Sequence, residues 1–250
     1  MKIIVADNYE QMSQIAARLV SKVIIQKPDA TLGLATGTSP IGTYKLLIEN
    51  CEKGIISFEK IHTVNLDEYV GLDHDNKNSY HYFMNENLFK YVDLKKENIH
   101  IPDGTGNDLI GNCKKYDNIL KKYPRDLQIL GIGGNGHIGF NEPGTPFKSY
   151  THIVNLTERT IKDNSRLFDK FEEVPKQAIT MGILEICRAK KIILLASGAG
   201  KADAIHSFIH GEVTENCPAS VLHLHNDITL VVDKDAASRL DKNIIEQITE

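Results

Sequence analysis

The sequence predicts an α/β protein whose core is a doubly wound, mostly parallel sheet with helices on both faces. Short apolar segments alternate along the chain with longer segments of helical periodicity, and this order is typical of strands joined by crossover helices. Two of the apolar segments, Ile192–Ala196 and Ile228–Val232, do not alternate between apolar and polar residues. A strand that is covered on both faces of its sheet has this pattern.

The amino-terminal half begins with a short apolar strand at Lys2–Ala6 and a helix at Asn8–Gln26. Residues at helical spacing give this helix one apolar face, made of Met12, Ile15, Ala16, Leu19, Val20 and Val23. Asn8 and Gln11 resemble a capping box at its start. The same alternation then predicts strands at Thr31–Ala35 and Ile61–Asn65, and helices at Ser39–Glu52, Ser79–Phe89 and Asp108–Lys122.

The carboxy-terminal half continues in the same way. Apolar runs predict strands at Asp126–Leu130, Thr151–Asn155, Lys191–Ala196 and Ile228–Val232, and helical spacing predicts helices at Glu158–Arg166, Lys176–Arg188 and Lys201–His210. No repeat, low-complexity tract or linker separates these elements, so we expect a single domain over residues 1–250.

The composition excludes several classes of protein. The chain has 250 residues, of which 41% are hydrophobic and 25% charged, so it is neither disordered nor fibrous. A net charge of −4 provides no basic face for nucleic acid. No apolar run reaches the ~18 residues of a membrane helix, and the N-terminus lacks a signal-peptide core. We therefore expect a cytoplasmic protein.

Neither disulfides nor metal sites are indicated. The cysteines are far apart and form no CxxC pair, as expected of reduced thiols, and they are Cys51, Cys113, Cys187 and Cys217. His206 and His210 are four residues apart on a predicted helix, but no third ligand is spaced to complete a metal site. We therefore expect no metal.

In a doubly wound sheet the ligand binds outside the carboxyl ends of the strands, so the loops at those ends indicate the chemistry. After Thr31–Ala35, Ser39 can cap the next helix, Pro40 suits its first turn, and Gly37 lets the backbone approach a ligand. Free N–H groups and the helix dipole would make this loop, with the hydroxyls of Thr38 and Ser39, a phosphate site. An ordinary strand-to-helix turn is the alternative.

The loop after Ile61–Asn65 carries two adjacent acids, Asp67 and Glu68. At the end of a buried strand, desolvation raises the pKa of a carboxyl group toward the range that suits a general base. A helix cap or a surface pair of acids explains the same residues equally well.

The loop from Gly131 to Gly144 contains the spacing GxGxxG directly after a strand. A dinucleotide-binding loop must also open a helix. Here Gly139, Pro143 and Pro146 prevent a helix, so we expect neither NAD nor FAD.

The same glycine-rich loop presents His137 and Glu142. A histidine with a carboxylate five residues later, in a glycine turn, suits an oriented pair for proton transfer. The alternative is a surface histidine in a flexible loop.

The loop after Lys191–Ala196 places Lys201 at the start of a helix, where it suits a phosphate. It is not a Walker loop, because Leu195 stands at the first glycine position and Ala202 replaces the Ser or Thr that would hold Mg²⁺. A solvated lysine is the alternative. Arg166 is a second candidate cation, for which a surface position is the simpler interpretation.

Four segments together resemble the glucosamine-6-phosphate deaminase family. They are LATGTSP (34–40), NLDEYVGL (65–72), GIGGNGHIGFNEP (131–143) and NSR (164–166), and the resemblance extends in order over essentially the whole chain. It implies a Rossmann-like α/β fold. It also implies conversion of glucosamine 6-phosphate and water to fructose 6-phosphate and ammonia, without an organic cofactor.

The resemblance also implies a role for each matching residue. Asp67 matches the enolisation base, which moves a proton between C2 and C1 of the sugar. His137 matches the group that opens the pyranose ring, and Glu142 matches its orienting partner. Asn135 matches a position that is Asp in some members, and its amide can hold the histidine without adding negative charge.

The phosphate of the substrate, a hexosamine 6-phosphate, is assigned by the same resemblance to Arg166, Lys201 and the turn of Gly37, Thr38 and Ser39. A phosphate dianion carries a charge of about −1.5 to −2. Because the chain is acidic, these few cations are needed to hold it.

Regulation is the point at which the sequence departs from part of the family. Some members are hexamers that N-acetylglucosamine 6-phosphate activates through hydroxyl and basic residues. In the matching stretch, Thr145–Val154, the basic residues are not at those places. We therefore expect weak or no allosteric activation, and a homo-oligomer remains compatible with the resemblance.

Two other functions compete with this interpretation. A related 6-phosphogluconolactonase would hydrolyse a sugar-phosphate lactone, but that reaction needs no base for a C2 proton, so Asp67 argues against it. A sugar-phosphate sensor domain of a transcription regulator would require a DNA-binding segment, for which we expect no room in 250 residues.

Overall fold

The computed structural model describes residues 1–165, 168 and 174–241, and its main element is a parallel sheet. Seven strands lie in the order β1-β10-β9-β6-β2-β3-β5, and every neighbouring pair is parallel. Their bounds are β1 (Lys2–Ala6), β2 (Thr31–Leu34), β3 (His62–Asn65), β5 (Ile99–His100), β6 (Leu127–Gly131), β9 (Ile192–Ala196) and β10 (Ile228–Asp233).

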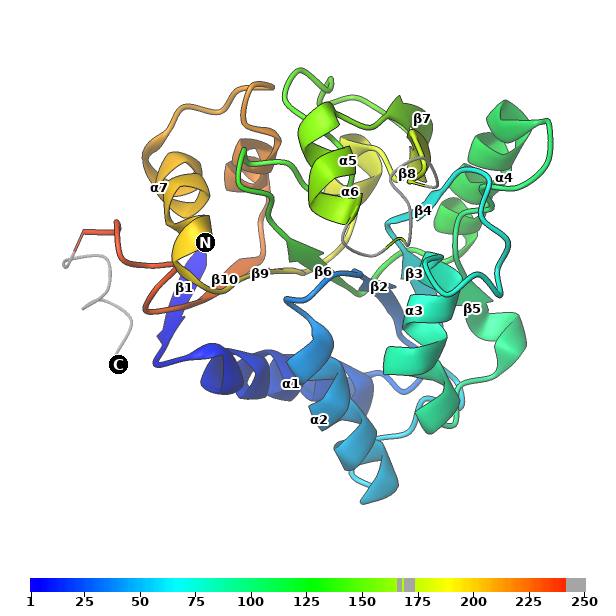
Figure 1. Cartoon of the computed structure of the whole chain (residues 1–250). Helices are drawn as coiled ribbons and strands as arrows, with labels where there is room; N and C mark the ends of the chain where they lie inside the picture. Colours follow the sequence, from blue (N-terminus) through cyan, green and yellow to red (C-terminus); the bar gives the residue numbers. More distant parts are fainter. Residues whose placement is uncertain (166–167, 169–173, 242–250) are drawn as a thin grey trace.

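Helices cover both faces of this sheet. The helices α1 (Tyr9–Gln26) and α2 (Ile41–Glu52) lie on one side, and α7 (Ala202–His210) lies on the other (Figure 1). All five residues of β9 are consequently buried, which explains its uninterrupted apolar sequence. The predicted fold class is confirmed.

The start of α1 shows how local chemistry fixes an element. Asn8 precedes the helix in an extended conformation, and its side chain accepts a hydrogen bond of 2.9 Å from the Gln11 N–H. This is half of the predicted capping box. The side chain of Gln11 accepts from the N–H of Asp7 instead of Asn8, so the reciprocal bond is shifted by one residue.

The chain changes direction across the sheet between β2 and β6. From β2 the strands β3 and β5 follow outward on one side, whereas from β6 the strands β9 and β10 follow outward on the other. The loops that leave β2 and β6 therefore diverge to opposite sides and open a crevice at the carboxyl edge. Ligands bind at such switch points in doubly wound sheets.

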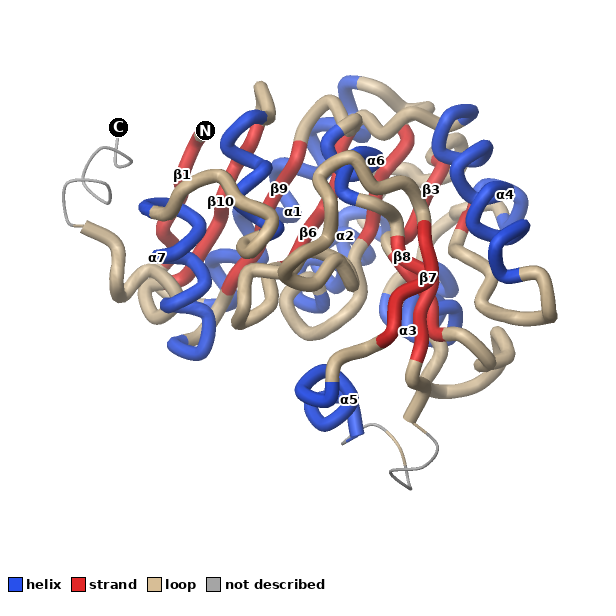
Figure 2. Tube along the Cα trace, turned by 90° about the horizontal axis from the view of Figure 1, so that it is seen from above, coloured by secondary structure: helices blue, strands red, loops and turns tan. Residues whose placement is uncertain are grey.

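A second, smaller sheet stands beside the main one (Figure 2). It is antiparallel and consists of β4 (Asp67–Tyr69), β8 (Gln177–Thr180) and β7 (His152–Asn155). A single residue, Leu66, separates β3 from β4, so the chain passes directly from one sheet to the other. Tyr69 and Ala178 contribute to a small hydrophobic cluster of their own there.

The helix predicted at Lys176–Arg188 is wrong in its first half. Residues 177–180 form β8, and only α6 (Ile183–Cys187) is helical. Ala178 and Ile179 are fully buried in strand conformation because β8 pairs with β4 on one side and β7 on the other. Tertiary pairing thus overrides the helical spacing of the segment.

The other helices agree with prediction to within a few residues, and they are α3 (Tyr80–Asn87), α4 (Leu109–Lys122) and α5 (Glu158–Ser165). Two short strands, β4 and β5, were not predicted. The expectation that Ser39 caps α2 is also wrong. The helix begins after Pro40 and has no capping bond from a side chain.

Membrane-spanning helices, clusters of metal ligands and disulfides are all absent from the part of the chain that the structure describes. No helix in residues 1–165 and 174–241 is long and apolar enough to cross a membrane. The same residues contain no group of three or more His, Cys, Asp or Glu side chains arranged to hold a metal ion. All four cysteines are unpaired.

Candidate active site

A cavity of about 320 Å³ lies at the carboxyl edge of the sheet, where β2 and β6 diverge. Its walls come from the ends of four neighbouring strands: the loop 35–39 after β2, residues 66–67 after β3, the loop 131–140 after β6, and Lys201 beyond β9. Tyr80 of α3 and Thr160 of α5 complete it. The four loops that the sequence singled out therefore meet in one place.

Two tyrosines hold the loop after β2. The hydroxyl of Tyr44, in α2, donates to the Ala35 carbonyl at 2.6 Å and accepts from the Ala35 N–H at 3.1 Å. The hydroxyl of Tyr9, in α1, donates to the Thr38 carbonyl at 2.9 Å. Gly37 adopts a φ of 85°, which favours glycine. The turn of Gly37, Thr38 and Ser39 thus lines the cavity in a fixed conformation.

The adjacent acids Asp67 and Glu68 have separate surroundings, as successive residues of a strand do. Asp67 lines the cavity. Glu68 faces away and accepts hydrogen bonds from the N–H groups of Tyr80 and His81, at 2.9 and 3.0 Å, at the start of α3. Glu68 is therefore the helix cap that the alternative interpretation predicted, whereas Asp67 lies where a substrate could reach it.

The environment of Asp67 suits a proton acceptor that works near neutral pH. Burial first, and the neighbouring charge of Glu68 second, raise the pKa of Asp67 to about 8. Only 6% of Asp67 is exposed, so desolvation of the charged form explains the larger part of the increase. A general base acts best when its pKa lies near the working pH.

The glycine-rich loop after β6 carries the second candidate group. His137 lines the cavity, and its Nδ1 lies 3.5 Å from Oε2 of Glu142. A Cβ atom at Gly133 would lie 2.2 Å from Cε1 of His137. The imidazole therefore packs directly on the backbone of Gly133, and this contact explains why glycine is needed there.

Three side chains hold Glu142 in its ionised form. Asn135 donates to Oε2 at 2.7 Å, and the hydroxyl of Thr160 donates to Oε1 at 2.9 Å. Burial alone would raise the pKa of Glu142, but the contacts with His137, Asn135 and Thr160 outweigh it and lower the pKa to about 2. A carboxylate fixed in this way can orient an imidazole.

Asn135 forms hydrogen bonds with both His137 and Glu142. Its side-chain oxygen accepts from the backbone N–H of His137 at 3.2 Å, and its NH₂ group donates to Glu142. The amide therefore positions the histidine through its backbone and through Glu142, and not through the ring. Thr160 is a residue that the sequence analysis missed, because no spacing in the chain connects it to Glu142.

Lys201 reaches the cavity from the loop after β9. Its Nζ donates to the carbonyl of Ile132 at 2.7 Å. Asp233, at the end of the adjacent β10, accepts from the hydroxyl of Ser197 and from the Gly198 N–H at 3.0 Å. This buried carboxylate fixes the turn that leads to Lys201. Arg166, the other predicted cation, lies outside the described residues.

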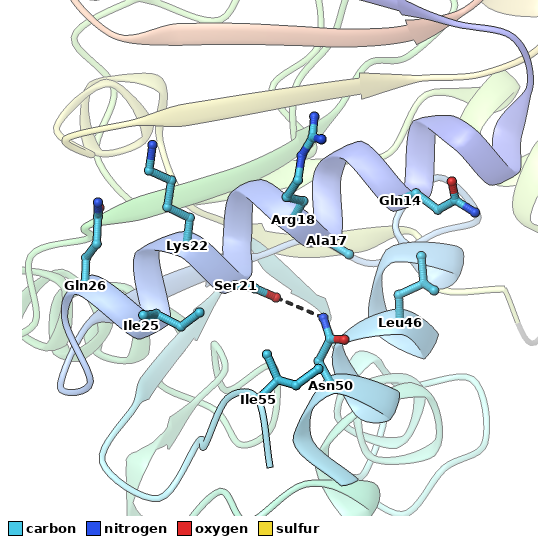
Figure 3. A pocket seen from close by; sticks show the side chains of 10 residues that line it. All are labelled: Gln14, Ala17, Arg18, Ser21, Lys22, Ile25, Gln26, Leu46, Asn50 and Ile55. Carbon is cyan, nitrogen blue, oxygen red and sulfur yellow. Dashed lines mark hydrogen bonds between the residues drawn. The ribbon is translucent and has the colours of Figure 1, made fainter. Parts of the chain in front are cut away.

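A larger hollow, of about 560 Å³, lies away from this edge between α1 and α2 (Figure 3). Arg18 and Lys22 stand on one side of it and Ile55 on the other, and Asn50 donates to the hydroxyl of Ser21 at 3.1 Å. Its lining contains no carboxylate, histidine or cysteine. The acid–base groups are in the smaller cavity, which is the candidate active site.

Comparison with known proteins gives consistent matches over nearly the whole chain. Residues 6–231 match the family model described as glucosamine-6-phosphate isomerases/6-phosphogluconolactonase. A glucosamine-6-phosphate deaminase of Thermoanaerobacter sp. (strain X514) is 52% identical over 249 residues, which cover 99% of this chain and 98% of the relative. One of Clostridium botulinum (strain Kyoto / Type A2) is 52% identical over 242 residues, 96% and 99% of the two chains.

Solved structures agree with the sequence matches. The structure of a monomeric glucosamine-6-phosphate deaminase has a TM-score of 0.93 and 49% identity, and the match covers 95% of this chain and 99% of that one. The 6-phosphogluconolactonase of Trypanosoma brucei has a TM-score of 0.78 at 18% identity, and the match covers 96% of this chain and 98% of that one. The second likeness shows the shared fold alone.

Proposed function

Because the chain belongs to the family of glucosamine-6-phosphate isomerases and 6-phosphogluconolactonases, we propose that it is a deaminase that converts glucosamine 6-phosphate and water to fructose 6-phosphate and ammonia. The observation that carries the proposal is that Asp67 and His137 line one cavity at the switch point of the sheet. Their surroundings differ in the way that two proton-transfer groups with separate tasks require.

The closed sugar hides its carbonyl group, so ring opening comes first. His137 accepts the proton of the C1 hydroxyl and delivers a proton to the ring oxygen as the bond between that oxygen and C1 breaks. Glu142 is ionised, and its Oε2 lies 3.5 Å from Nδ1 of His137, where it can orient the imidazole. The product of this step is an open-chain aldehyde whose C2 proton is acidic.

Asp67 then acts as the base. Its carboxylate takes the proton from C2 while the carbonyl oxygen at C1 is protonated, which gives an enol with the amino group still on C2. Return of the proton to C1 leaves an imine at C2. Water adds to this imine, the C–N bond breaks, and ammonia and the C2 ketone are released. Acid–base groups of this kind typically contribute 10²–10⁴-fold each.

The phosphate is assigned to the turn of Gly37, Thr38 and Ser39, to Lys201 and to Arg166. The turn and Lys201 line the cavity on the side of β2 and β9. The geometry supports this assignment. A glycine turn offers backbone N–H groups and Lys201 offers a cation. Hydrogen bonds to buried partners hold both of them. Anchoring by phosphate would fix the distance from C2 to Asp67.

The proposal includes catalysis without a cofactor, without allosteric activation and in the cytoplasm. A related deaminase that is 49% identical is monomeric, which supports activity of a single chain.

The decisive experiment measures ammonia and fructose 6-phosphate from glucosamine 6-phosphate with the wild-type chain and with Asp67→Asn. We expect Asp67→Asn to bind the substrate with little change and to lower kcat by about 10²–10⁴-fold. Asp93→Asn is the matched control, because Asp93 accepts the N–H of Phe58 outside the cavity. Hydrolysis of a 6-phosphogluconolactone, or binding without turnover, by the wild type would contradict the proposal.

A further inference from the structure

Glu68 is a buried carboxylate that the proposed mechanism does not use. It is 1% exposed, and its two oxygens have four polar contacts. Oε1 accepts from the N–H groups of Tyr69 and Tyr80, at 2.8 and 2.9 Å. Oε2 accepts from the His81 N–H at 3.0 Å and lies 2.8 Å from Nδ1 of the same histidine.

These contacts join two elements that both form walls of the cavity. Glu68 and Asp67 are neighbours in β4, whereas Tyr80 and His81 are the first residues of α3. The N-cap residue Ser79 accepts from the next N–H, that of Tyr82, at 3.0 Å. Glu68 therefore satisfies the helix N–H groups that Ser79 leaves unpaired, and it connects the helix start to the strand.

Tyr80 is the residue through which this link reaches the cavity. It lines the cavity together with Asp67. Its ring packs against Tyr69, with 4.8 Å between ring centroids, and against Phe140, with 6.1 Å. Displacement of the start of α3 would move Tyr80 and loosen the wall that faces Asp67.

We infer that Glu68 is a positioning residue for the proposed deamination: it locks β4 to the start of α3 and so holds Asp67 and Tyr80 in register against one substrate. The inference rests on the proposed function. A strictly structural cap could be served by a neutral acceptor, but a carboxylate one residue from the base also adds a charge that the base feels.

The charged and titratable groups around this link are few in the described residues. Asp67 interacts electrostatically with Glu68 of its own strand, with Tyr80 of α3 and with Tyr116 of α4. His137 shares its cavity. Glu68 faces His81, on which the exposed His74 stacks at 3.7 Å between ring centroids, and Asp103 interacts with both histidines.

The test compares Glu68→Gln and Glu68→Ala with the wild type. Gln retains an oxygen for the N–H groups of Tyr69 and Tyr80 but removes the charge, whereas Ala removes both. We expect Glu68→Ala to lower kcat by about 10–100-fold, since small displacements of reacting groups have effects of this size. We expect Glu68→Gln to lose less kcat and to move the acid limb of the kcat/KM profile to lower pH by about 0.5–1 unit.

The direction of the expected shift of the acid limb follows from the charge of Glu68. A negative neighbour disfavours ionisation of Asp67, so its removal lets Asp67 ionise at lower pH. A merely structural role of Glu68 would lower thermal stability without moving the acid limb. Asp126→Asn is the matched control, because Asp126 is also buried and accepts a backbone N–H, that of Thr31 at 2.9 Å, away from the cavity.

The outcomes separate the two proposals. An active wild type whose Glu68→Gln variant keeps the wild-type acid limb contradicts the inference alone. A wild type that releases no ammonia contradicts the proposed function, and with it the inference. If Glu68→Ala does not fold, the acid limb of Glu68→Gln decides the question.

Discussion

Two carboxyl groups of the site are placed in opposite environments. Asp67 is buried beside another acid, and its pKa is raised to about 8. Glu142 is buried among donors, which lower its pKa to about 2. The first can therefore exchange protons near neutral pH, while the second stays charged. This difference is the physical basis for assigning the base to Asp67 and the orienting role to Glu142.

The raised pKa of Asp67 predicts a stability effect with a definite sign. The unfolded chain ionises Asp67 near 3.8 and the folded chain near 8, so this residue destabilises the fold increasingly as the pH rises from about 4 to about 8. We expect Asp67→Asn to raise the free energy of unfolding at pH 8 by on the order of 2 kcal/mol.

The measurement is denaturant unfolding of both chains at several pH values. The advantage of Asp67→Asn should disappear as the pH falls below 3.8, where both states of the wild type bind the proton. Glu142 contributes with the opposite sign, because its lowered pKa stabilises the fold above about 4.5 and this contribution is lost as the pH falls toward 2. An Asp67→Asn variant that is less stable than wild type at pH 8 would contradict the assigned environment.

At the level of single elements, the loop after β9 shows how a buried acid, Asp233, helps to position the cationic side chain of Lys201. Asp233 holds Ser197 and Gly198, and the chain then turns through a short 3₁₀ segment, Ala199–Lys201, into α7. Since Asp233 lies in β10, the position of Lys201 depends on two adjacent strands of the sheet.

Lys201→Ala is expected to act mainly on binding. Loss of one charge-assisted contact to a phosphate corresponds to about 1.5–3 kcal/mol, so KM for glucosamine 6-phosphate should rise by about 10–100-fold with a smaller change in kcat. Steady-state kinetics measure both constants. Lys22→Ala, on the outer hollow of α1, is the matched control, and an unchanged KM in Lys201→Ala would remove this lysine from the phosphate site.

The elements that sequence patterns predicted well are those with one clear period. The buried run of β9 and the amphipathic α1 are found within two residues of expectation. The segment 176–188 was misassigned because a short strand in the middle of a three-stranded sheet is defined by its partners, β4 and β7, which lie far away in the sequence.

The location of the candidate site could be predicted from the sequence, but the role of each residue in it could be predicted only in part. Parallel strands bring the residues that follow them to one edge, so the loops could be located from the strands alone. The different surroundings of Asp67 and Glu68 could not be predicted from the sequence. They follow from side-chain alternation in β4, a strand of three residues without a pattern of its own. The contact of Thr160 with Glu142 could not be predicted either, because it depends on how α5 lies against the loop of Glu142 in the folded chain.

At the level of the whole molecule, Asp67, His137, Lys201 and the turn of Gly37, Thr38 and Ser39 line one cavity, and Glu142 contacts His137. A related monomeric deaminase with a TM-score of 0.93 has the same architecture. We therefore propose that a single chain is sufficient for catalysis.

We accordingly expect a hyperbolic dependence of rate on glucosamine 6-phosphate. Addition of N-acetylglucosamine 6-phosphate should change the half-saturating concentration by less than about twofold. Coupling between an activating site and an active site typically changes an affinity by about 5–150-fold, so a change below twofold indicates that no such coupling exists. Initial rates with and without the acetylated sugar test this. A sigmoidal curve that becomes hyperbolic on its addition would show that an activating site exists.

All of the proposed chemistry faces the carboxyl edge of the sheet, so the turns at the amino edge carry none of it. The turn that follows α2, at Lys53 and Gly54, is exposed and leads back to the start of β3. Attachment of the protein to a solid support through this turn would leave the mouth of the cavity open to the solution. An immobilised preparation made in this way should retain the turnover of the free protein.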